Sequence, residues 1–215
     1  MRQQRISLSA GVAATGYSLV LPSPWRRIPL RGGTQAAIKG ILDEVFRGLP
    51  RDKLAPYKYE IKQWLNRAAV TARQGGGTEL YLPVGLKEDS LISASFVVAE
   101  FPLESPGQAD PAVVAAELAA AEEGAQEVTV RGAPGVRTER TAEADPGAGV
   151  EYASRCVTYL VNVPGSPSRW LSIAFSTLGA GNPDDDFAQL LVQLFDAIML
   201  TFQWTLPKSS TGQEN

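Results

Sequence analysis

The chain has 215 residues, of which 44% are hydrophobic and 20% are charged, values that suit one soluble globular domain with a substantial core. It contains no histidine and one cysteine, which excludes an internal disulfide and any catalytic or metal-binding site built on histidine. No apolar run approaches the roughly 18 residues of a membrane-spanning helix, and the start of the chain lacks the dense apolar segment of a secretory signal. We therefore expect a cytoplasmic protein, with export as the alternative.

Opposite charges are concentrated in different parts of the chain. The net charge is only −3, yet residues 1–75 hold 13 basic and 4 acidic side chains, whereas residues 76–215 hold 7 basic and 19 acidic ones. Such a division predicts either a positive surface that meets a charged partner or two halves that neutralise one another within the fold.

The N-terminal region predicts two strands followed by a helix. Alternating apolar residues over 17–21 favour a strand, which ends at a Pro-Ser-Pro-Trp corner because proline cannot donate to a strand ladder. Residues 25–30 can resume as an edge strand. Apolar residues then keep helical spacing from Thr34, the expected N-cap, to Leu49.

A second helix is predicted after Pro56, and the glycines at 75–77 end it. Trp64 keeps step with the apolar stripe of this helix, so we expect it to be a core residue. Basic side chains occupy the remaining positions: Lys58, Lys62, Arg67 and Arg73. The segment 34–74 is therefore expected to be a helical hairpin with a basic outer surface.

The rest of the chain predicts further strands and two helices. The expected strands are 78–84, 91–101, 126–132, 135–144, 149–163 and 168–177. An alanine-rich helix is expected over 110–124, with Asp110 as its N-cap, and an apolar stripe predicts a last helix over 183–204. We expect one domain over 1–206, followed by a disordered polar tail at 207–215.

This order of elements predicts an α+β fold, in which an antiparallel sheet is sandwiched by helices, with an N-terminal helical hairpin insertion and a long C-terminal helix. Three stretches, "YSLVLPSPW", "CVTYLVNVPGSPSRWLSIAFST" and "FAQLLVQLFDAIMLTFQW", carry a resemblance to the PsbP-like superfamily, which includes LpqN-type proteins and small secretion-associated chaperones. The resemblance implies a mostly non-catalytic protein that acts in binding and assembly. The chain departs from this family in its longer helical hairpin and, relative to LpqN-type lipoproteins, in having no cysteine near its N-terminus.

Three arginines precede the expected start of the first helix: Arg26, Arg27 and Arg31. Free N–H groups at a helix N-terminus attract anions, although the segment lacks the Gly-Lys-Ser/Thr ending of a P-loop. Together with Lys58, Lys62 and Arg67 they predict a surface that binds an acidic partner or an anion; the alternative is that they are solvated. Nucleic acid is not expected, because the net charge is negative and Trp64 is assigned to the core.

Other polar groups favour structural roles. The aspartates Asp184–Asp186 are expected to cap the last helix rather than bind a cation. Cys156 has no histidine to activate it and is expected to be a buried thiol. Adjacent carboxylates such as Glu122 and Glu123 diverge by about 100° on a helix, so they cannot form an acid/base pair.

These observations predict a non-enzymatic adaptor or chaperone of a secretion or assembly system, with another protein as its partner and with no cofactor and no metal. The alternative is a small-molecule carrier with a pocket between the sheet and the last helix, lined by Tyr152, Tyr159, Phe175 and Phe195. An enzyme that uses carboxylates, serine or lysine also remains open, because acid/base catalysis does not require histidine.

Overall fold

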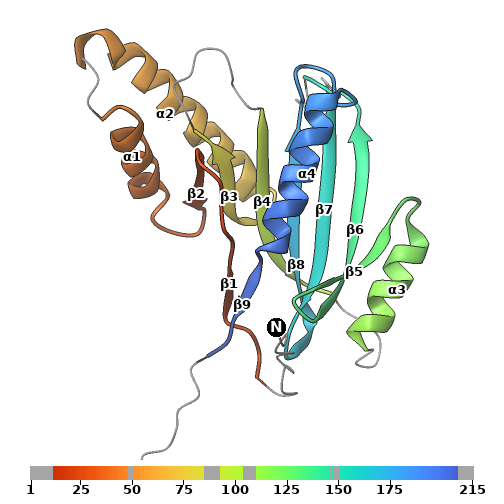
Figure 1. The fold of residues 1–215 in the computed structure, drawn as a ribbon. Coiled ribbons are helices and arrows are strands. Elements are labelled where there is room, and N and C mark those ends of the chain that lie inside the picture. Colours follow the sequence, from red (N-terminus) through yellow and green to blue (C-terminus); the bar gives the residue numbers. More distant parts are fainter. Residues whose placement is uncertain are drawn as a thin grey trace, which may run out of the picture.

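The computed structural model describes residues 12–47, 51–84, 93–103, 110–145, 147 and 151–207, without the side chains of 51–56. Its elements are β1 (Gly16–Ser18), β2 (Trp25–Pro29), α1 (Thr34–Val45), α2 (Arg51–Gln74), β3 (Gly77–Pro83), β4 (Ala94–Pro102), α3 (Pro111–Ala121), β5 (Gln126–Val130), β6 (Ala133–Ala142), β7 (Ser154–Val163), β8 (Ser166–Thr177), α4 (Asp186–Leu200) and β9 (Gln203–Thr205) (Figure 1). The first eleven residues, and the expected tail except for Pro207, lie outside the described residues.

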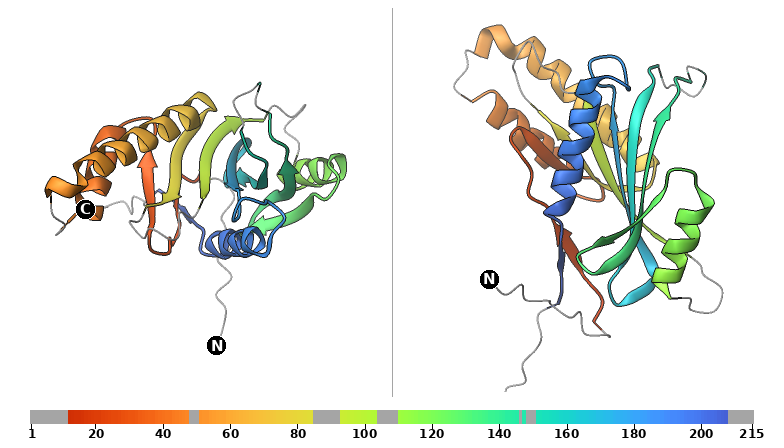
Figure 2. Two further views of the ribbon diagram at one scale, coloured as in Figure 1. Left: turned by 90° about the horizontal axis from the view of Figure 1, so that it is seen from above. Right: turned by 45° about the vertical axis from the view of Figure 1, so that its right-hand side comes forward.

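Seven strands form one antiparallel sheet in the order β2-β3-β4-β8-β7-β6-β5, and β1 pairs with β9 in a separate two-stranded ribbon. Helix α4 covers one face of the large sheet, whereas α1 and α2 cover one end of the opposite face and α3 covers its other end (Figures 1 and 2). The predicted α+β fold, with helices on both faces of an antiparallel sheet, is therefore confirmed.

The face under α4 carries an aromatic core. Phe195 of α4 stacks on Phe175 of β8, with ring centroids 4.8 Å apart, and also contacts Phe96 of β4 at 5.5 Å. Trp25, at the corner predicted from the prolines, is buried against Phe96. The last helix is therefore held on the sheet by tightly packed rings.

The opposite face has two smaller apolar clusters. Ile28, Leu80 and Leu82 of β2 and β3 pack against Ile38 of α1 and Leu65 of α2. At the other end of the sheet, apolar residues of α3 cover Trp170. Because α1 and α2 lie over β2 and β3 while α3 lies near β5 and β6, each end of the sheet has its own helical cover.

Of the two N-caps predicted for α1 and α3, the structure confirms one. Asp110 caps α3 as predicted, accepting a hydrogen bond from the N–H of Ala112 at 2.9 Å. The prediction of Thr34 as an N-cap is wrong, because Gly33 takes that position with φ of 74°, a backbone conformation that glycine adopts freely. The Thr34 hydroxyl instead donates to the carbonyl of Pro29 at 2.7 Å.

The C-terminal element is shorter than the prediction of a helix over 183–204. Helix α4 ends at Leu200, and the chain turns at Thr201 before Gln203–Thr205 pair with β1. The ribbon places Trp204 opposite Tyr17, and Tyr17 stacks on Phe202 at 5.3 Å. The two ends of the domain are thus paired with each other rather than with the large sheet.

Candidate functional site

The three N-terminal arginines do not converge on one anion site. Arg26 and Arg27 are neighbours on β2, so their side chains point to opposite faces of the sheet. Arg26 forms an ion pair with Glu44 of α1 at 2.6 Å, and Arg27 forms one with Glu79 of β3. Only Arg31 of the three is exposed without an ion pair among the described residues. Their guanidinium groups are therefore not gathered around one anion site, and binding of a partner or an anion by this surface stays a prediction.

Glu79 is the centre of a polar cluster under the N-terminal ribbon. Its carboxylate accepts hydrogen bonds from the hydroxyls of Tyr17 and Tyr81 and from the guanidinium of Arg27. Burial alone raises the pKa of Glu79, but these three donors outweigh it and hold the pKa below its ordinary value. Burial raises the pKa of both tyrosines, so they stay protonated as donors. The cluster fixes β1 to the sheet, and it is a structural link.

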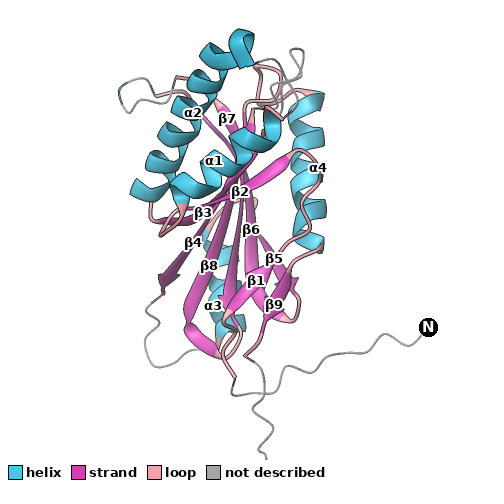
Figure 3. Cartoon of the chain, turned by 90° about the vertical axis from the view of Figure 1, so that its left-hand side faces the viewer, coloured by secondary structure: helices cyan, strands magenta, loops and turns pink. Residues whose placement is uncertain are grey.

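Helix α2 exposes a mixed aromatic and basic surface. We define the α2 outer surface by six exposed residues, of which Lys62 lies at the margin nearest the buried Ala69: Tyr57, Tyr59, Lys62, Trp64, Arg67 and Val70. Trp64 is 46% exposed, and Tyr57 and Tyr59 are 60% and 63% exposed. Figure 3 views the molecule from the side on which the helical pair α1 and α2 lies. The prediction of Trp64 as a core residue is wrong.

The helix geometry explains the position of Trp64. The buried side of α2 is centred on Leu65 and Ala69, and Trp64 is displaced from Leu65 by about 100° around the axis. Tyr57 and Trp64, seven residues apart, lie two turns apart on one flank of the outer surface. Tyr59 and Val70, eleven residues apart, lie on the other flank, and Arg67 projects between the two flanks.

Basic residues of α2 divide into paired and unpaired ones. Lys58 donates to Asp43 of α1 at 3.0 Å, and this hydrogen bond lowers the pKa of Asp43. Lys62 and Arg67 are exposed and form no ion pair within the described part of the chain. Of the six predicted partner-binding cations, Arg31, Lys62 and Arg67 therefore have charges that a partner can reach without breaking an ion pair.

A second charged cluster, absent from the sequence-based predictions, lies beside α4. Arg137 of β6 donates to Asp196 of α4 at 3.1 and 2.9 Å and to Glu139 at 2.8 Å. Arg155 donates to Glu139 at 2.7 Å. Burial opposes ionisation of Glu139, but the hydrogen bonds from Arg137 and Arg155 outweigh it and lower the pKa of Glu139. Alternation places Arg137 and Glu139 on one face of β6, which is the only sequence signal of this cluster.

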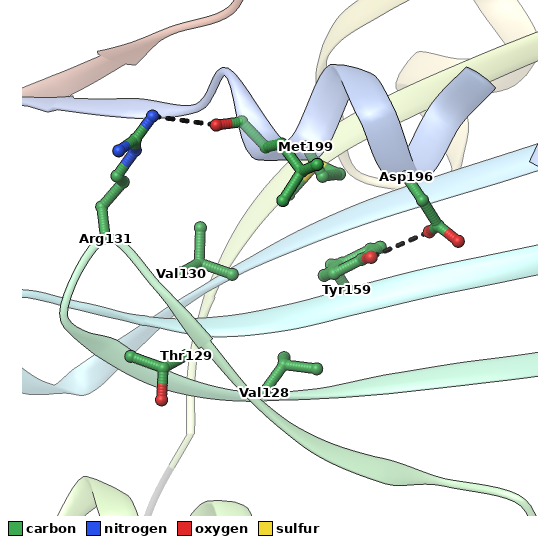
Figure 4. Close-up of a pocket in the computed structure, with 8 residues that line it drawn as sticks. Val128, Thr129, Val130, Arg131, Tyr159, Asp196 and Met199 are labelled. Atoms are coloured by element: carbon green, nitrogen blue, oxygen red, sulfur yellow. Dashed lines mark hydrogen bonds between the residues drawn. The ribbon is translucent and has the colours of Figure 1, made fainter. Parts of the chain in front are cut away.

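A cavity of about 470 Å³ lies between β5 and the C-terminal end of α4 (Figure 4). Its lining consists of Val128, Thr129, Val130, Arg131, Tyr159, Asp196, Met199 and Leu200. Within this lining the Tyr159 hydroxyl donates to Asp196 at 2.8 Å. Hydrogen bonds from Arg131 to the carbonyls of Leu200 and Phe202, at 2.9 and 2.8 Å, join the β5–β6 hairpin to the end of α4.

Only Tyr159 of the four predicted pocket residues lines this cavity. Phe175 and Phe195 are stacked on each other in the core, and Tyr152 is 64% exposed. Aromatic rings fill the space between the sheet and the middle of α4, so the cavity lies at the C-terminal end of this helix instead.

The remaining polar candidates have local roles. Asp185 caps α4 by accepting from the N–H of Ala188 at 2.6 Å, and this backbone hydrogen bond lowers the pKa of Asp185. The capping prediction is confirmed for Asp185, while Asp184 accepts from Thr141 instead. Cys156 is partly exposed rather than buried, because it points away from the face that α4 covers. Among the described residues, no three Cys, Asp or Glu side chains gather as metal ligands would.

None of the described helices combines the length and the apolar character needed to cross a membrane.

Comparison with known proteins assigns the chain to no family. No family model matches the chain, and no curated protein matches it. A protein of Bacteroides thetaiotaomicron VPI-5482 with a known crystal structure is similar to it at 10% sequence identity and a TM-score of 0.42. That similarity covers 93% of this chain and 50% of the other, so the chain spans half the length of that protein.

Proposed function

We propose that this protein is a non-enzymatic adaptor or chaperone of a secretion or assembly system, and that it binds an acidic partner protein through the α2 outer surface. One observation carries the proposal: Trp64, Tyr57 and Tyr59 are exposed on the helix that also carries the unpaired cations Lys62 and Arg67. Tryptophan, tyrosine and arginine are the residues most enriched among those that dominate binding energy at protein interfaces.

The exposed aromatic side chains are not needed to hold α2 in place. The other side of the helix is fully packed, with Leu65 at 0% exposure, and α1 is joined to α2 by the Gln35–Asn66 hydrogen bond at 2.7 Å. A partner that covers these exposed aromatic rings removes their apolar surface from water, which favours binding.

Charge indicates the chemistry of the partner. Between residues 57 and 74 the helix has four basic side chains and one acidic side chain, Glu60. An acidic surface would gain from Lys62 and Arg67, which have no competing ion pair in the described structure. Interactions between exposed charges weaken with salt, so we expect the association to slow and weaken as ionic strength rises.

The resemblance to PsbP-like proteins, most of which act in binding and assembly, supports the same kind of function. The helical hairpin is longer than a minimal member of that family would need. In this proposal the hairpin is the element that binds the partner.

Binding assays with paired variants test the proposal. Purified wild-type protein is immobilised, and partners are recovered from the native lysate at low and high salt. We expect Trp64→Ala and the double variant Lys62→Glu with Arg67→Glu to lose the recovered partner. The matched controls Tyr152→Ala and Lys39→Glu, which change exposed side chains elsewhere, should retain it. Equal recovery by all four variants, or recovery that does not depend on salt, would contradict the proposal.

A further inference from the structure

Strand β5 is one edge of the seven-stranded sheet. It pairs with β6 on one side through the two-residue turn Arg131–Gly132, both of which have positive φ, as a tight hairpin turn requires. On its other side no strand of the described structure pairs with it. A free edge exposes N–H and C=O groups that can pair with another extended chain.

The identity of the free backbone groups follows from the hairpin register. Antiparallel pairs alternate between residues that exchange both hydrogen bonds and residues that exchange none. Thr129 lies opposite Pro134, and proline has no N–H to donate, so this pair exchanges none. Thr129 and, two residues earlier, Glu127 therefore direct their N–H and C=O groups outward, away from β6.

The cavity of about 470 Å³ lies next to this strand (Figure 4). Val128 and Val130 form its β5 wall, and Met199 and Leu200 form its α4 wall. Leu200 is 77% exposed at the mouth. The two hydrogen bonds from Arg131 to the end of α4 hold the walls together, so the cavity is formed before anything enters it.

Polar groups around the cavity indicate which side chains a segment paired with β5 would need. Asp196, the acidic residue of the lining, already accepts from Arg137 and Tyr159, so the cavity favours an apolar side chain over a charged one. Glu127 is exposed on the opposite face of β5 and has no ion pair among the described residues. Successive side chains of a strand point to opposite faces, so an apolar residue at the cavity would be followed by a residue near Glu127.

We propose that the free edge of β5 is a second docking surface, which takes an extended segment of a partner protein as an added strand. The segment pairs with the backbone of Glu127 and Thr129, places an apolar side chain in the cavity and places a lysine or arginine next to Glu127. Strand addition is an established mode of peptide recognition in which main-chain hydrogen bonds give affinity and pockets for alternate side chains give specificity. The surface lies at the opposite end of the sheet from β2 and β3, which α2 covers, so one molecule can hold two partners.

A displayed library of random peptides, selected on the immobilised full-length protein, tests this proposal. We expect enriched peptides to alternate apolar and polar residues and to carry a basic residue next to an apolar one. Thr129→Pro removes the outward N–H without touching the hydrogen bonds to β6, and we expect it to weaken these peptides by about tenfold or more, since tenfold corresponds to the loss of about one hydrogen bond. Binding of an enriched peptide should also slow hydrogen exchange at the amides of Glu127 and Thr129.

Two further variants separate the cavity from the strand edge and keep the test valid if Thr129→Pro misfolds. Leu200→Asp should reject apolar peptides, whereas Leu190→Asp, an exposed leucine of the same helix outside the cavity, should not. Glu127→Lys should reject basic peptides, whereas Glu117→Lys on α3 should not. The proposal is overturned if no alternating peptide is enriched, if the variants bind as well as their controls, or if the edge is occupied by β5 of a second copy, seen as a dimer that Thr129→Pro dissolves.

Discussion

Arg137 and Asp196 form a two-pronged ion pair, with Nε to Oδ1 at 3.1 Å and Nη2 to Oδ2 at 2.9 Å. The pair joins β6 to α4 across 59 residues of sequence, and the Tyr159 hydroxyl donates to the same carboxylate at 2.8 Å. Helix α4 is therefore fixed on the sheet by a polar contact beside its aromatic core, and Asp196 and Tyr159 of this contact also line the cavity.

Replacement of Asp196 tests how much this contact stabilises the fold. In Asp196→Ala, Arg137 keeps only Glu139, and the largely buried Tyr159 hydroxyl has no acceptor left in the described structure. We expect the free energy of unfolding to fall by about 1–3 kcal/mol, the usual cost of leaving a buried donor unpaired. Urea denaturation measures it. Asp186→Ala, on the same helix but exposed, is the control, and equal losses for the two variants would contradict the assigned role of Asp196.

Glu79 should make the free energy of unfolding depend on pH in the acidic range. Its pKa lies below the ordinary value of 4.5 in the folded protein, so its contribution is complete above that value and is lost as the pH falls through the lower folded pKa. We expect Glu79→Gln to be less stable than wild type at neutral pH, and the difference to shrink as the pH falls below about 4.5. Thermal unfolding across this range measures it, and a difference that stays constant with pH would contradict the account of Glu79.

Trp64 and Leu65 are neighbours in the chain, but their replacement should change the stability of the fold by very different amounts. Leu65 is fully buried between α2 and the sheet, so Leu65→Ala should lower the free energy of unfolding by about 2–5 kcal/mol. Trp64 is half exposed, and Trp64→Ala should change it by less than about 1 kcal/mol. Denaturation of the two variants under identical conditions makes the comparison. A large loss of stability in Trp64→Ala would place this side chain in the core after all.

Asp185 should be the only strong cap among the three adjacent aspartates. Its carboxylate accepts from the backbone N–H groups of Ala188 and Ala180, and loss of an N-cap costs about 0.5–2 kcal/mol. Asp185→Ala should therefore be clearly less stable than Asp184→Ala, whose side chain contacts Thr141 at the surface. If the two variants unfold at the same denaturant concentration, α4 does not depend on this cap.

Local patterns in the sequence were enough to predict most elements of the fold. Alternating apolar residues predicted β3 to β8, because alternate side chains of each strand point into an apolar core. Asp110 and the run Asp184–Asp186 predicted helix starts, because a capping side chain acts within three residues. Beyond residue 200 the pattern failed, because Phe202 and Trp204 continue the apolar spacing of α4 while the chain itself turns back to meet β1.

Features that depend on contacts between distant segments could not be predicted. Trp64 lies next to the apolar stripe of α2, and only the placement of α1 and β3 decides which side of the helix is covered. Ion pairing of Arg26 and Arg27 depends on their opposite directions from β2. The cavity at β5 is formed by residues about 70 positions apart, and nothing in the sequence brings them together.

Photo-crosslinking at position 64 is the most direct test of the central proposal, that the α2 outer surface binds a partner protein. A photoreactive phenylalanine analogue replaces Trp64 in the full chain, with the same replacement of the exposed Tyr152 as the control. We expect illumination in lysate to join position 64, and not position 152, to one acidic protein, in a yield that falls with added salt. Identical products at both positions, or none at position 64 under low salt, would contradict the proposed function.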